Sequence, residues 1–422
     1  MSDASLCTRR SVSGALLCAL TASCVKTPKT AEPDAGAPAS AAAAKGTPAP
    51  VAPPILSFDE AVANTIRSVF ASAPAPDASP AIVVVDPLVD GATGYQSSAT
   101  ETIQARIIAL AKKEFPQYSI LQITSERLGR LPRFLIGTFT PIDAELKSEG
   151  QRESYWFCLV MGDLKTGRII AKSVARARLD DVNATPTAAF ADSPVWTDDP
   201  SVQAYVATCK GSRVGDPIKP EYLDGLLAAA LVSEASTAYD DGRYTEALDL
   251  FRTARRTSAG EQLRVFNGIY LSLLKLRRTA EATAAFGDLV AYGLQRNRLA
   301  VKFLFRPGSV RFAAGNGFSG NYDMWIQQIA SRAASSRKCL QITGHTSPTG
   351  SALLNDRLSL LRAEYIQSRL EGDEPHLKQR TVADGKGSRE NLIGTGRDDA
   401  SDMLDRRVEL SPIEACADTR RA

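Results

Sequence analysis

The sequence predicts a multi-domain protein that combines α/β and α+β units, and three observations support this. The chain has 422 residues, which at roughly 150 residues per domain corresponds to two or three domains. Apolar runs typical of strands alternate with amphipathic helical patterns toward both ends of the chain, whereas the middle is helical throughout. A segment rich in alanine and proline separates the first 23 residues from the part that can fold.

Composition narrows the function classes. Lys and Arg total 50 against 47 Asp and Glu, so the net charge is only +3 and a nucleic-acid partner is disfavoured. The hydrophobic fraction of 44% is sufficient for packed cores. His345 and His376 are the two histidines, which excludes a multi-histidine metal site and nearly excludes a Ser-His-Asp triad. We therefore expect a binding protein that is not an enzyme and needs neither a metal nor a cofactor.

The N-terminus carries an export signal. Arg9 and Arg10 precede the apolar run 15–20, and small residues then lead to Cys24, so residues 1–23 are typical of a signal peptide. The end at a cysteine resembles a bacterial lipoprotein signal, although Thr21 stands where that family usually has leucine. The resemblance implies cleavage before Cys24, acylation of its thiol and, because Val25 rather than aspartate follows, outer-membrane anchoring facing the periplasm. An ordinary signal in which Cys24 is accidental is the alternative.

Residues 24–55 read as a tether after the lipidated cysteine. Positions 25–54 contain 10 alanines and 7 prolines and no aromatic residue, so they cannot bury enough surface to offset the entropy of ordering.

Four cysteines remain for disulfides after export, since Cys7 and Cys18 leave with the signal and Cys24 carries the lipid. An even number is expected of an oxidising compartment. We favour one disulfide within each of two domains, although four cysteines allow three pairings; the favoured pairs are Cys158–Cys209 and Cys339–Cys416.

The first folded segment, 56–215, is predicted to be a two-layer or three-layer α/β domain. Helices are expected over 58–71 and 99–115, and the apolar run 81–85 is typical of a strand buried on both faces. Further strands are expected at 119–123 and 134–139, followed by a hairpin over 155–173 that turns at Gly167.

This pattern resembles the periplasmic α/β domain of the curli-export, flagellar and penicillin-binding-protein-activating outer-membrane lipoproteins. The residues that carry the resemblance are the strand 81–86, the Gly-Thr-Phe run 137–139 and the turn 163–167. The resemblance implies a scaffold or protein-contact module, and therefore an envelope protein as a partner. Asp86 and Asp90 are interpreted as strand-end turn residues rather than catalytic acids.

The second segment, 223–298, is helical and shows a repeat of 35 residues, which relates Ala247 to Ala282 and Phe251 to Phe286. This period and its small/large spacing are typical of tetratricopeptide repeats. A plain helical connector is the alternative to a peptide-binding groove.

The third segment, 300–416, begins with a strand at 302–305 and alternates helices (322–333, 354–370) with strands (340–346, 404–410). It resembles the OmpA-like C-terminal domain over nearly its whole length, which implies a βαβαβ core, with a further strand optional, that binds the peptide stem of peptidoglycan. The residues that carry the resemblance are Ile342-Thr343-Gly344-His345-Thr346, Gly350, Asn355, Leu358-Ser359, Arg362-Ala363 and Arg406-Arg407-Val408-Glu409.

The resemblance also assigns the binding residues. Arg362 lies at the family's ligand-binding arginine, and a guanidinium can hold a carboxylate of diaminopimelate through two hydrogen bonds. Fifteen residues earlier, where the family has an aspartate, this chain has Ser347. A charge-assisted hydrogen bond contributes roughly 1.5–3 kcal/mol and a neutral one about 1, so the change predicts binding about ten-fold weaker. The other expected contacts are Thr346, Asn355, Arg406 and Arg407.

Each assignment has an alternative. The alternative for Arg362 is a surface ion pair with Asp356 or Glu364. The alternative for Asn355 is to order the loop by capping the second helix, without contacting the ligand. Of Arg406 and Arg407, one is expected to face the site and the other solvent. His345 is interpreted as a strand-end residue rather than a catalytic base.

These predictions combine into an outer-membrane lipoprotein that binds peptidoglycan and tethers the membrane to the wall without turnover. The competing hypothesis is an envelope adaptor, in which the α/β and helical segments recruit a secretion, motility or wall-synthesis component. A wall hydrolase is the disfavoured third reading.

Overall fold

The computed structural model places residues 52–422 in one compact unit. Within it the structure describes residues 52–76, 80–128, 133–148, 151–180, 182–195, 200–297, 299, 301–313, 321–336, 338–394, 396, 401–413 and 416. The signal peptide, Cys24 and nearly all of the tether lie outside the described residues, so those assignments stay predictions. Within the described part of the chain, no helix combines the length and apolar character needed to cross a bilayer.

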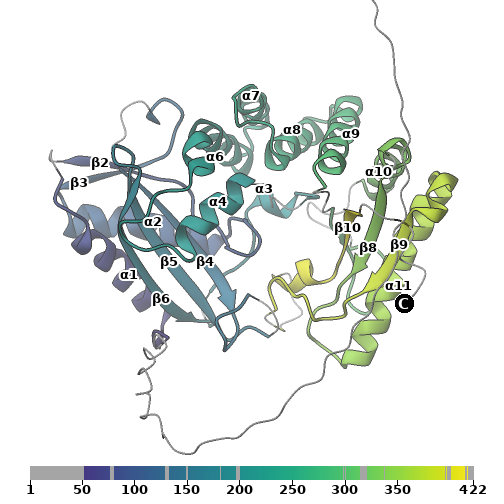
Figure 1. Cartoon of the computed structure of the whole chain (residues 1–422), viewed down its shortest axis with the longest axis horizontal. Coiled ribbons are helices and arrows are strands. Elements are labelled where there is room, and N and C mark those ends of the chain that lie inside the picture. Colours follow the sequence, from purple (N-terminus) through teal and green to yellow (C-terminus); the bar gives the residue numbers. More distant parts are fainter. Residues whose placement is uncertain are drawn as a thin grey trace, which may run out of the picture. The chain divides into compact units, whose positions relative to one another are not determined.

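The first segment is built on a six-stranded mixed sheet with the order β1-β6-β5-β4-β2-β3 (Figure 1). The strand β2 (Ala81–Val85) is parallel to both of its neighbours, β3 (Tyr118–Gln122) and β4 (Arg133–Ile142). The hairpin β5 (Ser154–Asp163) and β6 (Arg168–Arg178) continues the sheet antiparallel to β4. The short β1 (Ile55–Leu56), which the sequence analysis did not predict, pairs with β6.

Helices cover both faces of this sheet, which makes the domain three-layered. The helices α1 (Phe58–Ser72) and α2 (Ser98–Glu114) pack on one face, against alternate strand residues such as Leu135 and Phe139. On the opposite face α4 (Pro200–Cys209) and α5 (Pro220–Asp224) pack against Phe134 and Ile136. A short helix α3 (Ala188–Ala191) follows the sheet.

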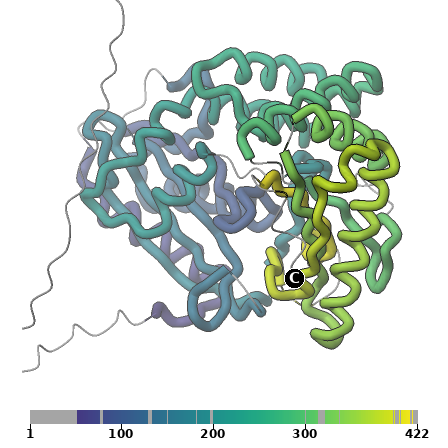
Figure 2. Tube along the Cα trace, turned by 45° about the vertical axis from the view of Figure 1, so that its right-hand side comes forward, coloured from purple at the N-terminus to yellow at the C-terminus, as the bar shows by residue number. Residues whose placement is uncertain are grey.

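The middle segment consists of two helical hairpins, α6 (Leu226–Asp240) with α7 (Tyr244–Arg255) and α8 (Leu263–Lys275) with α9 (Thr279–Gln295) (Figure 2). Gly268 allows close packing between the hairpins, since a Cβ there would lie 2.3 Å from the ring of Phe251. Two antiparallel hairpins agree with the expected helical repeat, while its assignment as tetratricopeptide repeats stays a prediction.

The third segment is a four-stranded sheet with the order β7-β10-β8-β9 and two long helices. The elements follow as β7 (Phe303–Leu304), α10 (Tyr322–Ser336), β8 (Cys339–Gly344), α11 (Ala352–Asp373), η2 (Pro375–Gln379), β9 (Thr381–Gly385), η3 (Ser401–Asp405) and β10 (Arg407–Ile413). The strand β9 adds to the predicted βαβαβ core and pairs parallel to β8. The last strand was expected from 404, but η3 occupies 401–405 and β10 begins at Arg407.

Two disulfides connect elements within the first and third segments. Cys158 on β5 bonds to Cys209 at the end of α4, with Cα atoms 6.0 Å apart. Cys339 at the start of β8 bonds to Cys416, with Cα atoms 5.6 Å apart. These are the two pairings favoured from the sequence.

The middle and third segments share one hydrophobic core. Trp325 of α10 stacks on Phe286 of α9 with ring centroids 5.6 Å apart, and its Nε1 donates to the Tyr270 hydroxyl at 2.7 Å. The buried cluster is continuous from Leu231 on α6 to Leu410 on β10.

Candidate functional site

The predicted binding residues gather where β8 ends and α11 begins. Gly344 closes β8, and the loop 345–351 leads into α11, whose N-cap Ser351 accepts a hydrogen bond from the Leu354 backbone at 3.4 Å. Gly344 packs so closely against α11 that a Cβ would lie 1.9 Å from the Ser359 carbonyl oxygen. This packing places the loop directly over the helix.

Asn355 orders that loop through hydrogen bonds. Its Nδ2 donates to the carbonyl oxygens of Ser347 at 3.4 Å and Thr349 at 3.1 Å. As the alternative from the sequence expected, Asn355 orders the loop. It does not cap the helix, however, because Ser351 is the N-cap residue.

Arg362 lies beneath the same loop and is fully buried. Its guanidinium donates to three backbone carbonyls at 3.0 Å each, those of Ser309, His345 and Arg306. It also lies over the ring of Phe305, 5.1 Å from the centroid. The arginine thus connects the segments that follow β7 and β8.

The surface ion pair considered for Arg362 does not form with Asp356. That carboxylate pairs with Arg389 at 2.6 Å, and full burial excludes a surface position for Arg362. A guanidinium in the interior must be hydrogen-bonded to be tolerated, and the carbonyls supply those bonds.

The side-chain hydroxyls of Thr346 and Ser347 differ in their hydrogen-bond partners. The Ser347 hydroxyl lies 3.0 Å from that of Thr349. Among the described residues, the Thr346 Oγ1 is buried without a hydrogen-bond partner. The Thr346 backbone is held, since its N–H donates to the Gly387 carbonyl at 2.9 Å and its carbonyl accepts from the Asn391 side chain at 2.8 Å.

The expectation that either Arg406 or Arg407 faces solvent is wrong. They are 5% and 2% exposed, respectively. Arg407 begins β10, which lies between β7 and β8 in the sheet. Arg407 donates to the Glu409 carboxylate at 2.5 Å and to the Glu390 carbonyl at 3.2 Å.

His345 directly follows β8 and lies in the interior, 1% exposed. Burial, followed by the positive charges of Arg407 and Lys386, lowers the pKa of its imidazole to about 2. A ring that stays neutral to such low pH does not take up a proton near neutrality, which agrees with a strand-end role rather than general-base chemistry.

A covering loop, residues 386–394, closes over the binding residues. Asp405 holds it by accepting three backbone N–H groups, from Leu392 at 2.7 Å, Ile393 at 3.0 Å and Gly394 at 2.8 Å. The loop in turn holds Thr346 through Gly387 and Asn391. The six predicted residues are between 0% and 7% exposed; they are Thr346, Ser347, Asn355, Arg362, Arg406 and Arg407.

The first segment also contacts the covering loop. Arg152, 3% exposed, donates from Nη2 to the Asn391 carbonyl at 2.6 Å and to the Ser148 carbonyl at 2.7 Å. Arg152, Asn391 and Asp405 were not predicted as site residues. Only Asp405 carried a sequence signal, its position directly before the Arg406-Arg407 pair.

Comparison with known proteins gives partial structural matches. No family model matches the chain, and none of the curated proteins matches it. The crystal structure of the peptidoglycan-associated lipoprotein from Burkholderia pseudomallei is 23% identical, with a TM-score of 0.24, and the match covers 26% of this chain and 89% of that one.

Two further matches have similar extents. The cell wall anchor of the T6SS from Pseudomonas aeruginosa is 20% identical, with a TM-score of 0.22, over 28% of this chain and 80% of that one. An outer-membrane protein from Borrelia burgdorferi is 22% identical, with a TM-score of 0.21, over 27% of this chain and 87% of that one. The three similar structures are thus described as peptidoglycan-associated, cell-wall-anchoring or outer-membrane proteins.

Proposed function

We propose that residues 300–416 bind the peptide stem of peptidoglycan non-covalently, while acylated Cys24 holds the other end of the chain in the outer membrane. One observation carries the wall-binding part of this proposal. The fold brings Arg362 directly under the loop that bears Thr346 and Ser347, with its Nη1 3.0 Å from the His345 carbonyl oxygen. Positions that the motif spacing marks as ligand contacts are therefore assembled in one place.

The loop offers donors to a carboxylate of the stem peptide. Thr346 is the most informative of them, because its buried hydroxyl has no partner among the described residues. An unsatisfied buried hydroxyl costs about 1–3 kcal/mol. A ligand oxygen at this position would recover that free energy, and the buried cation of Arg362 favours an anion there.

Ligand entry requires movement of the covering loop, because Thr346 and Ser347 are 2% and 6% exposed. The loop is attached to the site by side-chain and backbone hydrogen bonds rather than by a strand. Such segments open at lower free energy than the sheet itself.

Retention on purified sacculi tests the proposal. We use the whole exported chain with Cys24→Ser, which removes the lipid contribution, and measure co-sedimentation at several salt concentrations. Thr346→Val is the decisive variant: it keeps the shape of the side chain and removes a hydroxyl that is unpaired in the free protein. We expect an unchanged or slightly raised free energy of unfolding and about ten-fold weaker retention. Unchanged retention would reject the site.

A charge variant provides the complementary test. Ser347→Asp restores the acid that the resemblance expects, so stem-peptide ammonium groups gain a charged partner and retention tightens about ten-fold. Ser335→Asp on the exposed side of α10 is the matched control and changes nothing. A loss of retention in Ser347→Asp would show that this loop does not recognise an ammonium.

Two further experiments test the lipid anchor at Cys24 and the expectation that the protein does not cleave peptidoglycan. Cys24→Ser is expected to move the chain from the membrane fraction to the soluble periplasmic fraction, and mass spectrometry of the mature N-terminus reports acylation. Incubation of the chain with sacculi is expected to release no muropeptides. Released fragments would indicate a hydrolase instead.

A further inference from the structure

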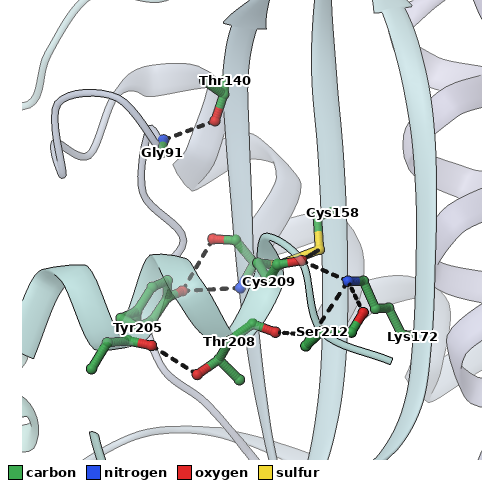
Figure 3. The surroundings of a disulfide bond; sticks show 10 residues. Gly91, Thr140, Cys158, Lys172, Tyr205, Thr208, Cys209 and Ser212 are labelled. Carbon is green, nitrogen blue, oxygen red and sulfur yellow. Dashed lines mark hydrogen bonds between the residues drawn. A yellow bond between two sulfur atoms is a disulfide. The ribbon is translucent and has the colours of Figure 1, made fainter. Parts of the chain in front are cut away.

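A second candidate site lies in the first segment, beside the disulfide between β5 and α4 (Figure 3). It is a cavity of about 230 Å³ on the sheet face that α4 covers. The residues that line it are Gly91, Thr138, Thr140, Ile142, Leu146, Ser148, Trp156, Cys158, Lys172, Val174, Val206, Cys209, Lys210 and Gly211.

The floor of the cavity is formed by three adjacent strands. In the sheet register Thr138 on β4 lies opposite Cys158 on β5, which lies opposite Val174 on β6. The next row along the sheet brings Thr140 opposite Trp156. The helix α4 forms part of the wall with Val206 and with Cys209, where the disulfide fixes its end to β5.

Positive charge is concentrated at the rim. Lys172 reaches from β6 to the end of α4, where its Nζ donates to the carbonyls of Cys209 at 2.7 Å and Ser212 at 2.6 Å (Figure 3). The Ser212 hydroxyl is a third neutral acceptor at 3.3 Å, and the Asp216 carboxylate interacts with the ammonium electrostatically. Lys210 is exposed beside it, and among the residues that the structure describes no aspartate or glutamate lines the cavity.

A strained residue forms part of the wall. Leu146 has φ of +64°, a left-handed conformation that is unfavourable for a leucine. Its side chain is 38% exposed and lines the cavity. Asparagine or glycine would adopt this backbone more readily, so folding alone does not explain an exposed leucine at this position.

We propose that this cavity binds a small organic anion with an apolar body. The apolar part lies against Trp156, Val174 and Leu146, and the anionic group faces Lys210 and Lys172. An apolar floor with a few polar groups placed at one side is the usual construction of a small-molecule site. None of the predicted wall-binding residues lines this cavity, although Arg152 bonds both to the Ser148 carbonyl at its wall and to the covering loop.

Isothermal titration calorimetry on the whole exported chain tests this inference, with four eight-carbon probes kept below their micelle concentrations. We expect octanoate, octyl sulfate or both to bind, and octylammonium and octanol to bind at least ten-fold more weakly. Octanoate alone would identify a carboxylate as the natural head group, and octyl sulfate alone a sulfate or phosphate ester. Equal binding of octylammonium, or no binding of either anion, would overturn the proposal.

Variants locate the binding. Val174→Phe fills the floor and is expected to abolish anion binding, whereas Lys210→Gln weakens it about three-fold, as expected of an exposed charge. Lys112→Gln, an equal change of charge on the exposed side of α2, leaves binding unchanged. Leu146→Asn is expected to raise the melting temperature, because it relieves the strain, and to weaken binding. Unaltered binding in both Val174→Phe and Leu146→Asn would place the ligand elsewhere.

Discussion

Asp86 shows how a single buried carboxyl makes stability depend on pH. It follows β2 in the interior, 6% exposed, and accepts a hydrogen bond from the Tyr222 hydroxyl at 2.9 Å. Burial raises its pKa from 3.8 to about 6, against the opposing effects of Tyr222 and Arg264. Because the folded state binds the proton more tightly than the unfolded state, folding is favoured as the pH falls from about 6 to about 4.

Asp86→Asn is the test of this linkage. It removes the charge and keeps an acceptor for Tyr222, so at pH 7 we expect a free energy of unfolding higher by up to about 3 kcal/mol. At pH 4, where the carboxyl is protonated in the folded state, the difference should nearly vanish. Urea denaturation of the variant and of the unsubstituted protein at both pH values measures this difference in the free energy of unfolding. Equal stabilisation at pH 4 and pH 7 would contradict the raised pKa of Asp86.

Helix packing in the middle segment depends on the absence of one side chain. Gly268 of α8 lies under the Phe251 ring, where a Cβ would approach to 2.3 Å. We expect Gly268→Ala to lower the free energy of unfolding by about 1–3 kcal/mol through overpacking. Gly372→Ala on α11, where a Cβ meets nothing within 4 Å, is the matched control and should stabilise by up to about 1 kcal/mol. Thermal unfolding that ranks the two variants in the opposite order would show that the helices adjust.

The disulfide between α4 and β5 closes a loop with a sequence separation of 51. The chain-entropy relation assigns such a loop about 4 kcal/mol of stabilisation. We expect the double variant Cys158→Ala, Cys209→Ala to unfold at correspondingly lower urea concentration. Reduction of the unsubstituted chain also breaks the Cys339–Cys416 bond, so it should unfold at a still lower urea concentration. Equal midpoints for the double variant and the oxidised, unsubstituted chain would contradict stabilisation by loop closure.

Strong apolar patterns made several elements predictable. The run 81–85 and the hairpin 155–173 appear as β2, β5 and β6, because strands buried on two faces need long apolar stretches. The helix α4 was missed because its ten residues contain no charged side chain to mark a solvent face. The strand β9 (Thr381–Gly385) corresponds to the strand that the resemblance left optional; no range was assigned to it from the sequence, and its pairing with β8 comes from the tertiary fold.

The sequence predicted which residues form the candidate site, but it did not predict that they are buried. Local spacing placed Thr346, Ser347 and Arg362 together, since one loop and one helix suffice to do so. Their burial under residues 386–394 depends on Asp405 and on Arg152, which is 239 residues away from its partner Asn391. Periodicity within a window of ten to twenty residues holds no information on such a contact.

At the scale of the whole molecule, Arg152 couples the first segment to the covering loop. We expect Arg152→Ala to lower stability by about 1–3 kcal/mol, since the Asn391 and Ser148 carbonyls lose a charged donor. Because the loop then opens at lower cost, retention on sacculi should rise while stability falls. Arg67→Ala, which breaks the exposed pair with Glu114 in the first segment, is the control and should alter stability and retention little. A parallel fall in stability and retention would mean that the loop forms part of the binding surface.

The core shared between α9 and α10 determines how this protein can be dissected. A truncation at residue 299 would strip Phe286 and Tyr270 from the indole of Trp325 and leave an aromatic surface in water. Such a piece is expected to self-associate during gel filtration. A start at 226 would in turn uncover Leu304, Ile393 and Leu404, which pack against Tyr95 of the first segment. We therefore expect a monodisperse product from a chain that starts at residue 52. Negative results obtained with the shorter piece would therefore report on insolubility and not on affinity for murein.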